Sequence, residues 1–535
     1  MNSKYLKQTR QKDLDSRRSF LKKSGLGLAL AAGVAPYLRL TSSSFANTGP
    51  ATPFAFTPFT RPLPIPSRYT PTALTPVPGA ADTAVGSAAV YHGIAPEYNP
   101  THRFNKASWV ETDPATGAPF KEVQHSVSIM PAIAEMIPGV KTPVFSYNGQ
   151  VPGPTIRARL GQPMVMRFEN KLSNVECSTH LHGGHSPSHA DGHPCFYIFP
   201  GRKRDYFYPH ITPRKADGKP ELESSPSTMW YHDHGNDMTA HNVAHGLCGF
   251  SILTDPLEEY MINTGVLPRV DALKSDGTAP RPGYEVTTQA PYDIPLSLHD
   301  TRLNADGTLY WDPFDHDGRL GDVFLVNGVA QPYLNVEPRK YRFRIAGMSL
   351  ARVWQVRLSN GQPMVQIGND SWLLNKGITV SDVLLNPAKR ADLIVDFTKL
   401  AGQTIYLENI MQQTDGRKPD GVDPTKPTRL LKFVVGKTVN KAYSEVTVRD
   451  GTLLRPHDLL KEADASVTRY FDFNRSNGAW QINSQFYSAF RCDAAIRTGA
   501  LEKWVLRNGS GGWGHPIHIH VEAHQIIRYN GVAPR

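Results

Sequence analysis

The sequence predicts an all-β protein built from three related domains, each a β-sandwich or Greek-key barrel. The 535 residues include 44 prolines and 43 glycines, which is typical of short strands joined by many turns. Long helical periodicity is scarce, and one sequence pattern recurs three times. The length is also sufficient for two to four domains with sizeable cores.

The first 46 residues have the pattern of an export signal. The basic segment Ser16–Lys23 (SRRSFLKK) precedes the apolar run Gly25–Ala35 and the small residues of Ser44–Ala46. This order is typical of a cleaved signal, and eleven apolar residues are too few for a permanent membrane span. The paired arginines resemble a twin-arginine signal, which predicts recognition by the twin-arginine translocation machinery. We expect an exported protein, periplasmic or secreted.

Residues 47–85 are expected to form a Pro-rich arm. Nine prolines lie between Pro50 and Pro78, and this density excludes regular helix. We expect the arm to be extended, either running over the body or loose.

The recurring pattern has an aromatic residue, a turn at Asn and a following strand. It begins at Phe145 (FSYNGQ) and Phe324 (FLVNGV) and again at Trp480 (WQINSQ). The three asparagines are 179 and 156 residues apart, which is a reasonable domain spacing. One of the following strands alternates well, with Tyr341, Phe343 and Ile345 on one face and Lys340, Arg342 and Arg344 on the other.

These repeats predict domain 1 at residues 86–256, domain 2 at 257–440 and domain 3 at 441–535.

The positive charge is concentrated in the leader. Of 58 Lys and Arg, nine lie in residues 1–46 against two acidic residues, and the remainder has 49 basic and 46 acidic residues. Because the body is nearly neutral, the sequence predicts no nucleic-acid partner.

The four cysteines form no CxxC motif. Cys177, Cys195, Cys248 and Cys492 could form disulfides in an exported protein, and three pairings are open.

Histidines indicate a metal site. His-x-His occurs three times, as HLHGG, WYHDHG and HPIHIH. On a strand, residues i and i+2 share a face, so each pair presents two imidazoles side by side. Imidazole suits copper, zinc, iron and nickel, and affinity favours copper over zinc. The third pair follows the second by 284 residues, so the first and last domains are expected to meet with metals between them.

The chain resembles the multicopper oxidases, most closely the branch of bacterial spore-coat laccase, bilirubin oxidase and phenoxazinone synthase. The matching segments are His180–Pro194, Met229–Phe250, Val326–Ile345, Asn386–Phe397 and His515–His520. The resemblance implies three cupredoxin-like domains and four coppers of types 1, 2 and 3.

The resemblance also assigns ligands. It places the type 2 copper on His180 and His518 and the type 1 copper on His515. Asp191 matches an acidic position near the type 2 copper, where a carboxylate could help to deliver protons; the alternative is a turn residue before Gly192. The type 3 pair takes the remaining ligands, His182, His232, His234 and His520.

Other residues near the motifs have weaker claims. Nothing in the family pattern makes His185, His189 or His193 ligands. His241 and His245 would share a face only if their segment is helical. We expect Asp233 to point away from the ligand face and to be structural.

The last family motif is not found. A type 1 site also needs a Cys thiolate and a second His, which in the family come from a His-Cys-His motif downstream of HPxHxH. The sequence stops fifteen residues after His520, and Cys492 does not match that motif. The pattern therefore predicts a fragment with a truncated third domain, inactive by itself.

The implied activity is one-electron oxidation of phenolic or similar substrates coupled to four-electron reduction of dioxygen to water. One alternative is an oxidase of Mn(II) or Cu(I), although the eleven methionines are scattered rather than clustered. The other is a copper-free structural cupredoxin protein, against which the retained histidines argue.

Overall fold

The computed structural model describes residues 50–74, 112, 117–215, 218–280, 289–313, 317–476, 479–488 and 490–534. The predicted export signal lies outside this range. Strands predominate, and the helices within it are short: α3 (Thr239–Ala244), α4 (Pro256–Asn263), η4 (Ser188–Ala190), η5 (Leu222–Ser224) and η6 (Glu462–Asp464). None of the helices in this part of the chain is long and apolar enough to cross a membrane. The all-β prediction is confirmed.

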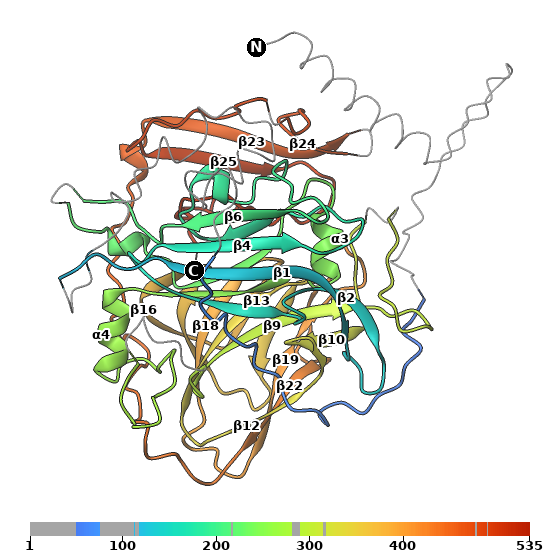
Figure 1. Ribbon diagram of the computed structural model, residues 1–535, viewed down its shortest axis with the longest axis vertical. Helices are drawn as coiled ribbons and strands as arrows, with labels where there is room; N and C mark the ends of the chain where they lie inside the picture. The colour runs from blue at the N-terminus through green and yellow to red at the C-terminus, as the bar shows by residue number, and fades with distance from the viewer. Residues whose placement is uncertain are drawn as a thin grey trace, which may run out of the picture. The chain divides into compact units, whose positions relative to one another are not determined.

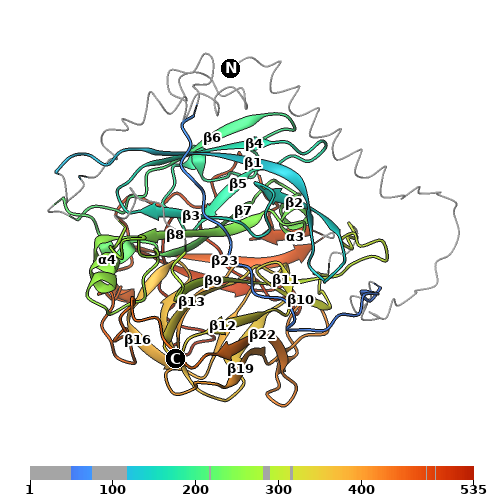
Figure 2. The same ribbon diagram turned by 60° about the horizontal axis from the view of Figure 1, so that its bottom comes forward.

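The first group of strands forms two four-stranded sheets that enclose one core (Figures 1 and 2). One sheet has the order β2-β1-β4-β6, with β1 (Val123–Ala134), β2 (Thr142–Tyr147), β4 (Met164–Asn170) and β6 (Lys203–Tyr208). The other has the order β3-β8-β7-β5, with β3 (Gly153–Arg159), β5 (Thr179–His182), β7 (Thr228–Asp233) and β8 (Cys248–Thr254).

The second group forms sheets of seven and five strands around a larger core. The first has the order β11-β10-β9-β13-β18-β15-β16, with β9 (Asp293–Thr301), β10 (Val323–Val326), β11 (Val329–Ala330), β13 (Lys340–Gly347), β15 (Met364–Asn369), β16 (Trp372–Val380) and β18 (Arg390–Asp396). The second has the order β12-β22-β19-β14-β17, with β12 (Tyr333–Val336), β14 (Trp354–Leu358), β17 (Asp382–Leu385), β19 (Thr404–Asn409) and β22 (Thr428–Val435). A short ribbon pairs β20 (Met411–Gln412) with β21 (Gly421–Val422).

The third group is the sheet β24-β23-β25, with β23 (Val467–Ser476), β24 (Ala479–Ile482) and β25 (Glu502–Asn508).

The same arrangement opens all three groups. Strands β1, β9 and β23 each pair antiparallel with the next strand and parallel with a later one (β4, β13 and β25). Asn148, Asn327 and Asn483 all sit in the turn with φ of 54°, 49° and 53°, where Asn is favoured among non-glycine residues. Each Asn Oδ1 accepts a hydrogen bond from a backbone N–H of the first strand, at Ser128, Ser297 and Asp472 (2.6, 2.8 and 2.8 Å). The sequence repeat is therefore a structural repeat, while the boundaries at residues 256 and 440 stay a prediction.

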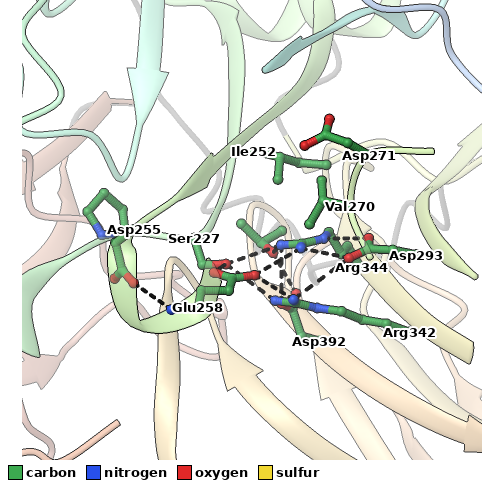
Figure 3. A network of polar contacts seen from close by, with 12 residues as sticks. Ser227, Ile252, Asp255, Glu258, Val270, Asp271, Asp293, Arg342, Arg344 and Asp392 are labelled. Atoms are coloured by element: carbon green, nitrogen blue, oxygen red, sulfur yellow. Dashed lines mark hydrogen bonds and ion pairs between the residues drawn. The ribbon is translucent and has the colours of Figure 1, made fainter. Parts of the chain in front are cut away.

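Strand β13 buries both of its faces. Tyr341, Phe343 and Ile345 enter the apolar core, as their alternation predicts. Arg342 and Arg344 on the other face are also fully buried, in an ion network with Glu258, Asp293 and Asp392 (Figure 3).

The network joins α4, which follows β8, to strands of the second group. Arg342 Nη1 lies 2.6 Å from Glu258 Oε1, and Arg344 Nε lies 2.7 Å from Asp293 Oδ1. Burial raises the pKa of Glu258, but the charges of Arg342 and Arg344 outweigh burial and lower it to about 2. Buried charges persist only when paired in this way.

The described part of the Pro-rich arm, residues 50–74, runs along the body. The Leu63 N–H donates to Tyr333 O (2.7 Å) and the Tyr69 N–H to Thr155 O (3.2 Å), which ties the arm to the second and then to the first group of strands. Leu63 is buried in the second core, and Arg68 is paired with Asp271. Of the two forms predicted for the arm, these residues adopt the extended, docked one.

Candidate metal centre

Strands β5 and β7 place the first two histidine pairs side by side. The strands are antiparallel, with His180 opposite His232 and His182 opposite Trp230. Opposite residues project to the same face, so the three histidines meet there. All three are buried, and His234 follows one residue after the end of β7.

The third pair is placed by side-chain contacts instead of by a strand. His518 and His520 lie in a segment without regular structure, because no strand of the described residues pairs with it. The His518 ring stacks on His182 at 3.7 Å, and the His520 ring stacks on His180 at 3.9 Å (centroid distances). The expected meeting of the first and last parts of the chain is therefore observed, although the expected strand geometry is not.

Together these side chains form a cluster of six imidazoles, which we call the histidine cluster. The His180 ring lies at its centre, with its centroid 3.9 to 5.5 Å from those of the other five. His180 Nε2 and His518 Nε2 are 3.3 Å apart, as are His182 Nδ1 and His232 Nε2. One metal ion can be shared by two nitrogens at such a separation. The members are His180, His182, His232, His234, His518 and His520.

Asp191 orients two of the rings. Its Oδ2 accepts a hydrogen bond from His520 Nδ1 (2.6 Å), and its backbone oxygen accepts one from His180 Nδ1 (2.6 Å). Both contacts leave the Nε2 lone pairs free, as in metal sites where a carboxylate or carbonyl fixes the tautomer. The following Gly192 has φ of +69°, and a Cβ there would collide with the backbone of β5.

Burial favours the neutral form of four of these histidines. Burial lowers the pKa of His182 and His232 far below the usual value, that of His234 to about 4 and that of His518 to about 2. Burial raises the pKa of Asp191, but hydrogen bonds and charge from His180 and His520 outweigh it, and the net shift is downward. Neutral imidazoles and an ionised carboxylate are the forms that bind or support metals.

The residues fit copper. Six imidazoles without a thiolate suit it, and His234 Nδ1 is buried with no hydrogen-bond partner among the described residues. His180, His182 and His518 each place a nitrogen within 4.8 Å of the others, and His180, Asp191 and His520 form a second such group.

His515 lies apart from the histidine cluster. Its Nε2 is 2.6 Å from Ser510 Oγ, and its ring meets Trp480 edge-on at 4.8 Å. It belongs to neither ligand group found among the described residues. A separate position agrees with a separate type 1 site, and that role stays a proposal.

The second group of strands supports the site through contacts that the sequence did not predict. Gly183, just after β5, has no room for a Cβ because Ser371 Oγ and Arg390 Nη2 lie against it. Ser371 O accepts from the N–H of Ser227, the residue before β7. The turn that contains Ser371 therefore contacts both β5 and β7, and we call these contacts the clamp at Gly183. No pattern in the sequence predicted them.

Trp230 was also missed. Its ring stacks on His232 at 4.2 Å and lies 5.3 Å from His182. Its place two residues before His232 puts it on the ligand face of β7, so period-two spacing could have identified it.

The neighbouring residues behave largely as expected. Asp233 accepts hydrogen bonds from Ser178 N (2.9 Å), Gly235 N (3.1 Å) and Asn242 Nδ2 (3.0 Å), and burial raises its pKa to about 7. These contacts agree with the structural role predicted for Asp233, which stays a prediction.

Further histidines lie outside the ligand groups. His185, His189 and His193 are in neither of those found in the described chain. His241 and His245 lie on or just after α3 with ring centroids 4.1 Å apart, so the helical condition for a shared face is met.

All four cysteines are free, so none of the three open pairings is formed.

Comparison with known proteins identifies the family. A family model described as multicopper oxidase matches residues 130–258. The laccase of Bacillus subtilis is 31% identical over 431 residues, which cover 72% of this chain and 75% of that protein. This chain belongs to the multicopper oxidase family. Copper, in sites of types 1, 2 and 3, is the cofactor of the family.

Further relatives agree. The bilirubin oxidase of Albifimbria verrucaria is 31% identical over 418 residues, 75% of this chain but only 65% of that protein. Two solved structures share the fold of this multicopper oxidase. The CueO of Ochrobactrum sp. has a TM-score of 0.63 at 24% identity, covering 80% of this chain and 86% of that chain. The laccase of Pediococcus acidilactici has 0.60 at 21% identity, covering 86% and 79%.

Proposed function

We propose that this protein is a laccase-like oxidase that takes single electrons from phenolic or similar reductants and reduces dioxygen to water. The observation that carries the proposal is the histidine cluster, in which three His-x-His motifs from distant parts of the chain meet around His180. Relatives named laccase and bilirubin oxidase support it.

In this proposal three coppers sit in the cluster. His180 and His518 hold the type 2 copper, consistent with the 3.3 Å between their Nε2 atoms. His515 belongs to the type 1 site, where the reductant gives up electrons. When bound, copper supplies the change of oxidation state that moves electrons to dioxygen. The type 3 pair takes His182, His232, His234 and His520.

The protein residues supply position and protons. Asp191 fixes the rings of His180 and His520 through their Nδ1 atoms, and its carboxylate is placed to hold a proton beside the cluster. Trp230 and the clamp at Gly183 hold the ligand strands and keep the site compact.

The alternatives are less well supported. The cluster argues against a copper-free structural protein, since six imidazoles converge there and His234 Nδ1 is buried without a hydrogen-bond partner among the described residues. No feature of the described residues favours Mn(II) as the reductant.

We further propose that the protein is exported to the periplasm or secreted, through the twin-arginine route. The leader of residues 1–46 supports this.

Copper loading and dioxygen consumption test the function. The metal-free full chain would be loaded with copper, and dioxygen uptake would be measured with 2,6-dimethoxyphenol and with ascorbate. We expect copper to bind at the cluster, and dioxygen uptake with at least one reductant once the chain is supplied with the Cys thiolate and second His of the type 1 site. The proposal is wrong if no copper binds, or if a copper-loaded chain that includes those type 1 ligands consumes no dioxygen with either reductant.

A further inference from the structure

A cavity with soft donor atoms lies between the end of α3 and the end of β9. His245, His299, Met136 and Met348 line it. Ser349 lines the cavity as well, and this residue is only 6% exposed. Its hydroxyl has no hydrogen-bond partner among the described residues. A buried polar atom without a partner indicates that something else occupies the space beside it.

Cys248 stands directly behind His299. Its Sγ lies 3.9 Å from His299 Nε2. The thiol is free and fully buried, and it shares a buried apolar cluster with Trp230 and Met348. His299 lines the cavity, and Cys248 lies behind it, outside the lining, in the same buried cluster as the thioether of Met348.

This pair continues the metal-binding face of the sheet. In the β7–β8 ladder Cys248 lies opposite His232, and opposite residues project to the same face. His180 lies opposite His232 on the other side. A row of ligand-type side chains thus crosses β5, β7 and β8 and reaches His299 on β9.

The separation of the two atoms suits one metal ion. Metal–sulfur and metal–nitrogen bonds of about 2.3 and about 2.0 Å span 3.9 Å with an angle of about 130° at the metal. Thiolate, thioether and imidazole together select Cu(I). Arg319 also lines the cavity, and its charge disfavours a divalent ion more than a monovalent one.

We propose that Cys248 and His299 bind a Cu(I) ion between them, beside this cavity, with Met348 as a third donor, and that this site passes copper to the histidine cluster. On binding, the ion replaces the thiol proton, which is released to water, and copper stays in the Cu(I) state. The site lies outside the copper sites proposed above, and its detection does not depend on turnover.

The test uses the metal-free full chain without oxygen, titrated with Cu(I) from its bicinchoninate complex. X-ray absorption reports copper–sulfur bonds, which the histidine cluster cannot give. Wild type and the control Cys492→Ser, which removes an exposed thiol, should bind one more Cu(I) than Cys248→Ser and show a shell at about 2.3 Å. An unchanged count and sulfur shell in Cys248→Ser would overturn the site.

A second variant guards against misfolding. His299→Gln keeps the thiol and should weaken Cu(I) binding at this site at least tenfold, with an unchanged circular dichroism spectrum. Unchanged affinity in His299→Gln would also overturn the site. The transfer role predicts slower filling of the cluster in both variants with the same final content there, and an unchanged filling rate would refute that role. If a chain that includes the type 1 ligands shows the sulfur shell but fails to reduce dioxygen, only the oxidase proposal is refuted.

Discussion

His180 Nε2 and His518 Nε2 lie 3.3 Å apart, although 338 residues separate them in the sequence. Two neutral nitrogens this close repel each other unless a proton or a metal ion lies between them. Substitution of His518 therefore tests whether the cluster binds a metal ion.

Removal of His518 should remove metal from the cluster. We expect His518→Ala to bind about one copper fewer per chain and to hold the rest more weakly, since neighbouring ligands lose a shared ion. Metal analysis after dialysis measures this. His524→Ala is the control, because His524 is exposed; equal copper loss in both variants would contradict the assignment.

Asp191 should control affinity more than fold. Asp191→Asn keeps the size of the side chain but removes the charge that orients His180 and His520. We expect copper affinity to fall by about 10- to 100-fold, the usual effect of losing such a supporting group. Competition with a chelator measures it, and an affinity within twofold of wild type would show that Asp191 is only a turn residue.

Asp191 should also shape acid stability. Its pKa is lower in the folded protein than its ordinary value of 3.8, so the folded chain binds fewer protons there than the unfolded chain. The ionised carboxylate of Asp191 therefore adds to the free energy of unfolding. This contribution is complete above about pH 5 and is lost as the pH falls through the lowered pKa. The difference in unfolding free energy between wild type and Asp191→Asn, measured without metal, should shrink below about pH 4. A difference that grows on acidification would have the wrong sign.

Removal of any one charged side chain from the buried ion network should destabilise the folded protein. Arg344→Met would leave Asp293 and Asp392 buried with less positive charge, and we expect a loss of about 3–5 kcal/mol in the free energy of unfolding. Urea denaturation measures it. The matched exposed pair is Arg507–Asp472, where Arg507→Met should cost less than about 1 kcal/mol.

The docked arm should contribute to stability through Leu63. Leu63→Ala should cost about 2–4 kcal/mol, because the side chain is buried in the second core. Ile65→Ala, two residues away and 38% exposed, should change stability by about 0.5 kcal/mol. Similar losses at the two positions would mean that the arm adds no specific packing.

Much of the fold could be predicted from the sequence because it depends on local sequence patterns. The turns at Asn148, Asn327 and Asn483 are short-range features, so the sequence shows them three times and the structure repeats them. The depth of burial of Arg342 and Arg344 was not readable. Strand alternation shows that they share a face, while Glu258, which neutralises them, comes from a helix more than eighty residues earlier.

At the metal centre, too, the local features could be predicted from the sequence and the long-range contacts could not. Period-two spacing was enough to pair His180 with His182 on one face and to predict that the third motif would join them. The sequence could not show that His518 and His520 reach the site without a strand, nor that Ser371 presses on Gly183. Those features depend on contacts between parts of the chain that are distant in sequence.

The shared position of His180 and His518 has a mechanical consequence. A copper ion held by both would close a loop of more than three hundred residues and act as a removable cross-link between β5 and the segment that follows β25. Because only the folded chain offers both nitrogens, every increase in free copper shifts the balance towards the closed form, by about 2.7 kcal/mol at a hundred times the dissociation constant. Copper supply would then govern how long the protein survives, as well as whether it can work.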